Sequence, residues 1–315
     1  TYLNEQLPYI VNKMTLSNYV SQNFLTNLAF LFNLLPEDLR HGYTSSGQSE
    51  CVDKIAKVLW YKAKNDPAYV SKNIKMLTFK DHFFGMGSFL SRSLSREKDV
   101  LFPTHHLDHP TAENYHDVLL EVEKEFNKKT YLAVWVEPLT QLYMTAIPRE
   151  FLVGLKALAK KHQVFLVYNE TGSSMFRYSR DHYFISSDPE LRPDIGMSFL
   201  GAQAGMVFTK SELFLDKPLM LISTWDGDEF SFANYVTAAK SILNHKDEYF
   251  SLIDRFQAKL IASLQTFSNI EVHFNNGVGW IKGNLPFKLK KKVHAAKGRY
   301  IICPNWEEME RYLES

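Results

Sequence analysis

A run of six apolar residues, Tyr131 to Val136, constrains the fold more than any other feature of the sequence. It reads YLAVWV and has no polar position, so a strand formed by it is apolar on both faces. Such a strand belongs in a sheet that is covered on both sides. The run therefore predicts a buried strand inside a layered α/β domain.

Segments of helical and strand-like pattern alternate on either side of this run. Apolar residues recur at helical spacing over 49–60, over 115–126 and from Pro148 onward, and proline is a good residue at the start of a helix. Each helical pattern is followed by a strand-like apolar run. These runs cover 74–79, 131–136 and 164–168. Helices alternating with buried strands predict an α/β fold with a mainly parallel central sheet.

Changes of pattern along the chain predict three parts. Residues 1–38 are expected to form an N-terminal helical segment, and residues 39–245 the large α/β domain. Residues 246–315 combine helical patterns with short strand-like runs, which predicts a small C-terminal α+β domain. Its last helix is expected to open at Asn305, with Glu308 at the position of a capping box.

Composition excludes several classes of protein. The formal net charge is +1, with 45% hydrophobic and 23% charged residues, which gives no basis for binding nucleic acid. Apolar stretches are too short to span a bilayer, so no membrane role is expected. Cys51 and Cys303, expected to be packed thiols, suit a reducing compartment, and we expect a cytoplasmic protein. The chain starts at Thr1 without methionine, as a processed product or an excised domain would.

Common catalytic signatures are missing from the sequence. It contains no Walker A loop, nucleophile elbow, HExxH motif or paired CxxC, which argues against hydrolases and NTPases. One local group of histidines and acidic residues has the right ligand types for a metal, but its spacing fits no established pattern. We favour a proline-containing surface loop and predict no metal site. The group is His105, His106, Asp108, His109, Glu113 and His116.

Six short motifs follow one another in a characteristic order. They are SGQSE from Ser46, FFG from Phe83, VEP from Val136, YNE from Tyr168, PDI from Pro193 and STWDG from Ser223. This order resembles the class III pyridoxal-phosphate-dependent aminotransferases of fold type I, and lysine ε-aminotransferase in particular. In that family the motifs read SGxEAxE, FHG, VEP, DE, PDI and STWGG. The resemblance covers about residues 40 to 245, and it implies a fold-type I large domain with a reduced small domain.

The resemblance implies a binding site for the cofactor. Ser46, Gly47 and Gln48 match the phosphate cup, where free amide N–H groups and the helix dipole favour an anion. Phe83 matches an aromatic residue that stacks on the pyridine ring. Thr224 matches a threonine that reaches the phosphate of the neighbouring subunit. Glu137 in the VEP motif and Asn169 in the YNE motif complete this set of vestigial cofactor residues.

Two departures from the family pattern bear on activity. Leu200 stands where the resemblance places the Schiff-base lysine, and a leucine neither tethers the cofactor nor transfers a proton. Lys210, the nearest lysine, is ten residues further on. Asn169 replaces the aspartate that pairs with the pyridine nitrogen, which weakens cofactor binding. Glu137 and Glu170 are expected to be structural carboxylates.

These departures favour a pseudoenzyme, a degenerate class III aminotransferase-like protein kept as a binding or assembly partner. No catalytic residue is expected, and no cofactor unless pyridoxal phosphate binds non-covalently. The alternative is an aminotransferase-related enzyme that uses non-covalent pyridoxal or pyridoxamine phosphate. A homodimer is expected, or a heterodimer with an active paralogue, to whose site this chain contributes Thr224 across the interface.

Overall fold

The computed structural model describes most of the chain. The described residues are 4–5, 21–67, 69, 74–98, 100–217, 220–221, 226–265, 267, 269–284, 294–296 and 298–314. Among the helices in these ranges, none combines the length and apolar character needed to cross a bilayer.

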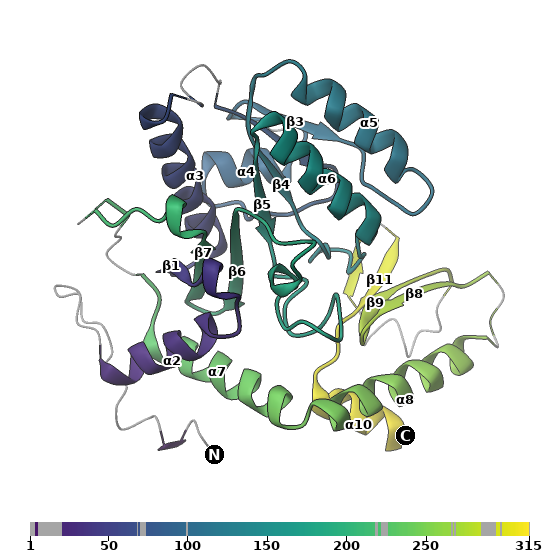
Figure 1. Cartoon of the computed structure of the whole chain (residues 1–315). Helices are drawn as coiled ribbons and strands as arrows, with labels where there is room; N and C mark the ends of the chain where they lie inside the picture. The colour runs from purple at the N-terminus through teal and green to yellow at the C-terminus, as the bar shows by residue number, and fades with distance from the viewer. Residues whose placement is uncertain are drawn as a thin grey trace.

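A seven-stranded sheet forms the centre of the large unit (Figure 1). All neighbouring strands are parallel except β7, which is antiparallel to both of its neighbours. The predicted mainly parallel α/β sheet is therefore confirmed. In order across the sheet, the strands are β1 (His41–Ser45), β7 (Ala204–Thr209), β6 (Ile195–Gly201), β5 (Phe165–Asn169), β4 (Tyr131–Val136), β2 (Lys75–Phe79) and β3 (Thr104–Leu107).

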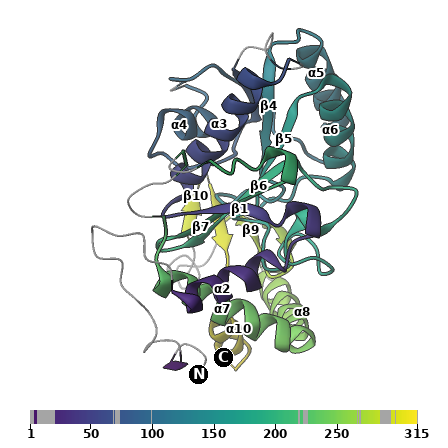
Figure 2. The same cartoon turned by 60° about the vertical axis from the view of Figure 1, so that its left-hand side comes forward.

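Helices cover both faces of this sheet, as the apolar strand β4 requires (Figures 1 and 2). One face packs against α3 (Gln48–Asn65) and α4 (Phe89–Ser95). The other face packs against α5 (Tyr115–Phe126) and α6 (Arg149–His162). Where that face reaches β6 and β7, the covering helices are α2 (Gln22–Phe32) and α7 (Glu229–Asn244). Short 3-10 helices connect these elements; those in the described ranges are η2 (Glu37–Leu39), η3 (Ile185–Ser187) and η4 (Ser211–Leu213).

The C-terminal unit has its own sheet and core. Four antiparallel strands lie in the order β10 (His294–Ala296), β11 (Arg299–Ile302), β9 (Val278–Lys282) and β8 (Glu271–Asn275). The helices α8 (Lys246–Leu264) and α10 (Trp306–Glu314) pack on it through a shared apolar cluster. Asn276 and Gly277 have φ angles of 44° and 86°, which is the left-handed backbone of a tight hairpin turn.

The capping box predicted at the last helix is present. The Asn305 backbone N–H donates to Glu308 Oε2 at 2.9 Å, and the Glu308 N–H donates to Asn305 Oδ1 at 2.8 Å. Both contacts satisfy amide donors that the first turn of a helix leaves without intrahelical partners.

Two expectations about single segments are wrong. His105 and His106 lie on the edge strand β3 instead of a loop, because their backbone pairs with β2 despite the polar side chains. Cys51 is a buried thiol as expected, whereas Cys303 is exposed, since it follows the last strand of the small sheet.

Candidate functional site

The carboxyl ends of β2, β4 and β5 lie at the same edge of the sheet because these strands are parallel. Phe83 follows β2, Glu137 follows β4, and Asn169 ends β5. In open α/β sheets, ligands bind outside the carboxyl ends of the strands. The structure thus brings together three of the residues that the sequence selects.

Asn169 connects these strand ends through its side-chain amide. Its Nδ2 donates to the Phe83 carbonyl at 2.9 Å and to Glu137 Oε1 at 3.3 Å. Its Oδ1 accepts from the Thr171 N–H at 3.1 Å and from the Thr171 hydroxyl at 2.7 Å. The residue is fully buried, and these four contacts match its two donors and two lone pairs. Asn169 is therefore a hydrogen-bonded junction within the protein.

The Phe83 backbone is held from three sides. Besides Asn169, the side-chain amides of Gln141 and Gln48 donate to its carbonyl, at 2.8 Å and 3.3 Å. Its N–H donates to Glu137 Oε2 at 2.7 Å. The half-buried Phe83 side chain is thereby carried on a fixed backbone at the strand-end edge.

Glu137 is the buried acid of this network. It has no exposed surface, and beyond Phe83 and Asn169 it accepts from the Gln141 N–H at 3.3 Å. Burial raises the pKa of the Glu137 carboxyl well above its ordinary value, and the hydrogen bonds from Phe83 and Gln141 partly oppose this shift.

The neighbouring carboxylate, Glu170, turns away from this network. It accepts the N–H groups of Ile185 and Ser186 at 2.6 Å and 3.1 Å, and also the Ser186 hydroxyl. Burial raises the pKa of Glu170 to about 7, against the lowering effect of these donors. Glu170 thus anchors the short helix η3 to the end of β5.

The residues expected to bind a phosphate begin α3. Gly47 is the N-cap and provides no side-chain hydrogen bond to the helix. A Cβ added at Gly47 would meet no atom within 4 Å, so there is open space beside Gly47. Ser46 instead turns toward the helix: its N–H and hydroxyl both donate to Glu50 Oε2, at 2.6 Å and 2.8 Å.

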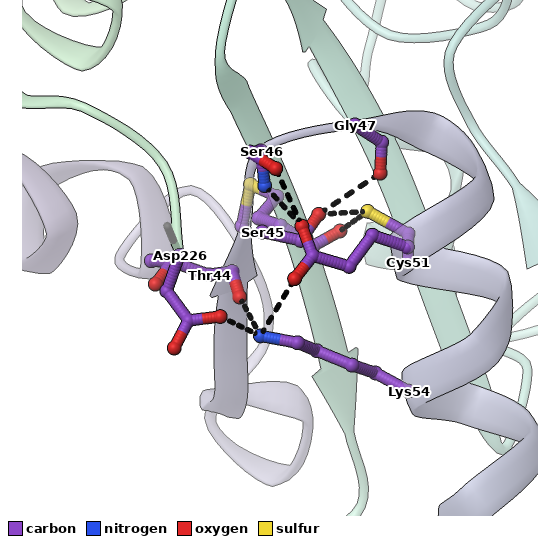
Figure 3. Close-up of polar contacts among 9 residues, drawn as sticks. Thr44, Ser45, Ser46, Gly47, Cys51, Lys54 and Asp226 are labelled. Atoms are coloured by element: carbon purple, nitrogen blue, oxygen red, sulfur yellow. Dashed lines mark hydrogen bonds and ion pairs between the residues drawn. The ribbon is translucent and has the colours of Figure 1, made fainter. Parts of the chain in front are cut away.

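A buried lysine that the sequence reasoning missed lies beside this cup (Figure 3). The Lys54 Nζ donates to the Thr44 carbonyl at 2.7 Å and to Asp226, and lies 3.8 Å from Glu50 Oε1. The spacing of Glu50 and Lys54 on one helix is a sequence signal for an ion pair. The partner Asp226 is distant in sequence and gives no such signal.

Leu200 lies at a β-bulge. The β6–β7 pairing shifts register between Phe199 and Gly201, so Leu200 is the extra residue. Its half-buried side chain packs against the apolar cluster beneath α2 and α7, which includes Phe208 and Phe232. Position 200, where the resemblance places the lysine, therefore contributes to the core.

Lys210 lies at the opposite end of the same hairpin. It forms an ion pair with Asp194 at 2.5 Å, just before β6 begins. Seven residues of strand separate Asp194 from the bulge end of β6, a length of about 20 Å. Lys210 is thus ion-paired far from the strand-end network.

A hydrogen-bond relay connects the bulge to the strand-end network. The Phe199 N–H donates to the Thr171 hydroxyl at 2.9 Å, and that hydroxyl donates onward to Asn169 Oδ1. Thr171 and Gln141 were missed by sequence reasoning, because neither stands in a recognisable motif. Thr224, Trp225 and the rest of the segment 222–225 lie outside the described residues.

Within the described ranges, no group of three or more His, Cys, Asp or Glu side chains is arranged to hold a metal ion. His82 accepts the Glu137 N–H at 3.0 Å and is buried, and burial lowers the pKa of its imidazole well below the ordinary value. His82 therefore supports the strand-end network as a neutral side chain.

The fold is that of the transaminases of fold type I. No family model matches the sequence. A transaminase from the marine bacterium Virgibacillus superposes with a TM-score of 0.80 and 13% identity. An (S)-enantioselective omega-transaminase from Thermomicrobium roseum gives 0.76 and 16%, and a mutant of M. tuberculosis Rv3290C gives 0.78 and 15%. Each match covers 99% of this chain and 82% of the other.

This comparison corrects the expectation that the chain has no cofactor. Transaminases are among the solved structures that share this fold, and pyridoxal phosphate is the cofactor that the motif resemblance assigns to such a fold. The residues present fit its phosphate, because Gly47 leaves open space at the uncapped start of α3. At position 200, which only the motif pattern assigns to the lysine, the side chain is that of leucine and carries no amine.

Asn169→Asp is expected to lower the free energy of unfolding by about 3 kcal/mol at pH 8. The buried Nδ2 donor is lost, and the new carboxyl group lies against the carboxyl group of Glu137. The loss should be smaller at pH 5, where one proton is shared between the two acids. Urea unfolding at both pH values measures this. The exposed N-cap change Asn305→Asp is the control. Equal losses at both pH values would contradict the carboxyl pairing.

Proposed function

We propose that this chain is a degenerate class III aminotransferase-like protein that holds pyridoxal or pyridoxamine phosphate non-covalently and does not transaminate. The motif order further suggests descent from a lysine ε-aminotransferase. The observation that carries the proposal is Leu200, which occupies the lysine position of the motif pattern and packs into an apolar cluster.

The chain's own residues support binding of the phosphate. The first turn of α3 has backbone N–H groups that receive no side-chain hydrogen bond from the N-cap Gly47, and an anion is favoured there. Phe83, on its fixed backbone, is the aromatic side chain assigned to the cofactor ring. When bound, the cofactor supplies an electron sink. The protein's part is then to bind and orient it, with no amine at position 200 to hold or move a proton.

Asn169 supports the same proposal. A neutral amide that is already hydrogen-bonded to four protein atoms gives the pyridine nitrogen no ionised partner. Binding then depends mainly on the phosphate and on contact with Phe83. A protein of this kind serves as a binding or assembly partner, and we infer a homodimer, or a heterodimer with an active paralogue that receives Thr224.

One experiment tests the proposal on the wild-type protein. Titration with pyridoxal phosphate is expected to show saturable binding, and pyridoxal without the phosphate should bind at least tenfold more weakly. After borohydride reduction, intact mass spectrometry should find no pyridoxyl adduct. Light scattering of the same sample should show a dimer.

Three results would contradict the proposal. They are a borohydride-fixed adduct on any lysine, amino-group transfer by the purified protein, and a failure of pyridoxal phosphate to bind. An adduct mapped to Lys54 would be the most informative, because that amine contacts Glu50, which also accepts the Ser46 N–H.

A further inference from the structure

Lys54 sits at the centre of a buried network that joins three parts of the chain (Figure 3). Its side chain is 4% exposed, and its partners Asp226 and Glu50 are 16% and 22% exposed. The ammonium group contacts the Thr44 carbonyl, one residue before the end of β1, as well as both carboxylates. Two of its three N–H donors are used by the Thr44 carbonyl and by Asp226, and Glu50 lies at ion-pair distance.

The network reaches the phosphate cup through Glu50. One Glu50 oxygen faces Lys54, and the other accepts both the N–H and the hydroxyl of Ser46. Ser46 is the residue directly before the N-cap Gly47. Lys54 and the backbone of Ser46 are therefore linked through one carboxylate, that of Glu50.

The network also reaches the segment before α7. Gly227, directly after Asp226, has a φ of +95°, and a Cβ there would lie 3.1 Å from the carbonyl oxygens of both Ser45 and Gln203. The next residue, Asp228, donates its N–H to the Gln203 carbonyl at 3.0 Å. Residues 226–228 thus lie against both the start of the cup and the turn of the β6–β7 hairpin.

We propose that Lys54 is a positioning residue for the phosphate cup: with Asp226 and Glu50, it fixes Ser46 and so sets the affinity of the α3 N-terminus for the phosphate of a ligand. This inference rests on the proposed function and adds a determinant of affinity to it. A charge network that is nearly buried holds its geometry because water does not compete for its hydrogen bonds.

Lys54→Met removes the charge and keeps the length of the side chain. Lys54 and Asp226 line a cavity of about 330 Å³ whose other walls include Leu28, Phe32 and Leu221, so an apolar side chain has apolar neighbours there. Asp226→Asn is the complementary variant. The matched control is Lys57→Met, an exposed lysine on the same helix.

Calorimetric titration is the first measurement, with pyridoxal phosphate and pyridoxal as the two probes. Lys54→Met and Asp226→Asn should weaken pyridoxal phosphate binding about tenfold and leave pyridoxal binding within twofold, whereas Lys57→Met should change neither. A merely structural role would weaken both probes equally, and that result would overturn the inference.

Hydrogen exchange is the second measurement and needs no ligand. Peptides covering 44–48 and 226–232 should both exchange faster in Lys54→Met and in Asp226→Asn, with peptides from α5 and α6 unchanged. Unchanged exchange at 44–48 would overturn the inference even in a folded variant. If the wild type does not bind pyridoxal phosphate, the proposed function fails, and the exchange result alone decides on the coupling.

Discussion

Leu200→Lys is expected to convert the protein from one that forms no covalent adduct to one that is largely modified by pyridoxal phosphate after borohydride reduction. The motif pattern assigns the lysine to position 200, the extra residue of the bulge at the end of β6, and its neighbour Phe199 belongs to the relay through Thr171. A primary amine is the group that forms an imine with the aldehyde. Intact mass spectrometry with peptide mapping measures the modified fraction.

The matched control carries Lys210→Met in addition to Leu200→Lys. Because Lys210 pairs with Asp194 at the far end of the hairpin, its removal should leave the adduct unchanged. The substitution costs some packing in the cluster beneath α2 and α7, so a thermal melt must confirm folding. A folded double variant without an adduct would show that position 200 does not face the cofactor, and the family assignment of that position would be wrong.

Glu170→Gln is expected to remove about 3 kcal/mol of pH dependence from the free energy of unfolding. In the folded protein the pKa of Glu170 is about 7, against an ordinary value of 4.5. The folded state therefore holds this proton more tightly than the unfolded state. Stability from this group is fully present below about pH 4.5 and is lost as the pH rises to 7 and above.

The measurement is a double difference. Urea unfolding gives the free energy of unfolding of Glu170→Gln and of the wild type at pH 4.5 and at pH 8. The weaker hydrogen bonds of Gln to the Ile185 and Ser186 donors cost the same at both pH values, so this cost cancels in the difference. Relative to wild type, the variant should gain about 3 kcal/mol between the two pH values. The exposed change Glu121→Gln should gain nothing. A gain of zero for Glu170→Gln would mean that Ile185 and Ser186 keep the carboxyl ionised in the folded protein.

Local patterns predicted the elements whose causes are local. Strand β4 has the bounds read from its apolar run, and the last helix has its capping box. Strands β1 and β3 were missed, because HGYTS and THHL are short and polar. Both are edge strands that exist through pairing with β7 and β2, which no local pattern indicates.

The candidate site divides in the same way. The motifs selected Phe83, Glu137 and Asn169, and these residues lie at one edge of the sheet because parallel strands have their carboxyl ends on the same side. The burial of Lys54 was not predictable, since it depends on Asp226, 172 residues away in sequence. An isolated Glu–Lys spacing on a helix is usually a solvated pair, and tertiary packing alone makes this one buried.

The pairing of β1 with β7 has a consequence for synthesis of the chain. His41 pairs with Thr209, so β1 has no partner strand until β7 has been synthesised. Closing so long a loop is slow compared with forming local contacts, and the intervening α/β units have all left the ribosome by then. The strand that leads into Ser46 and Gly47 is thus expected to be among the last parts of the nascent domain to fold.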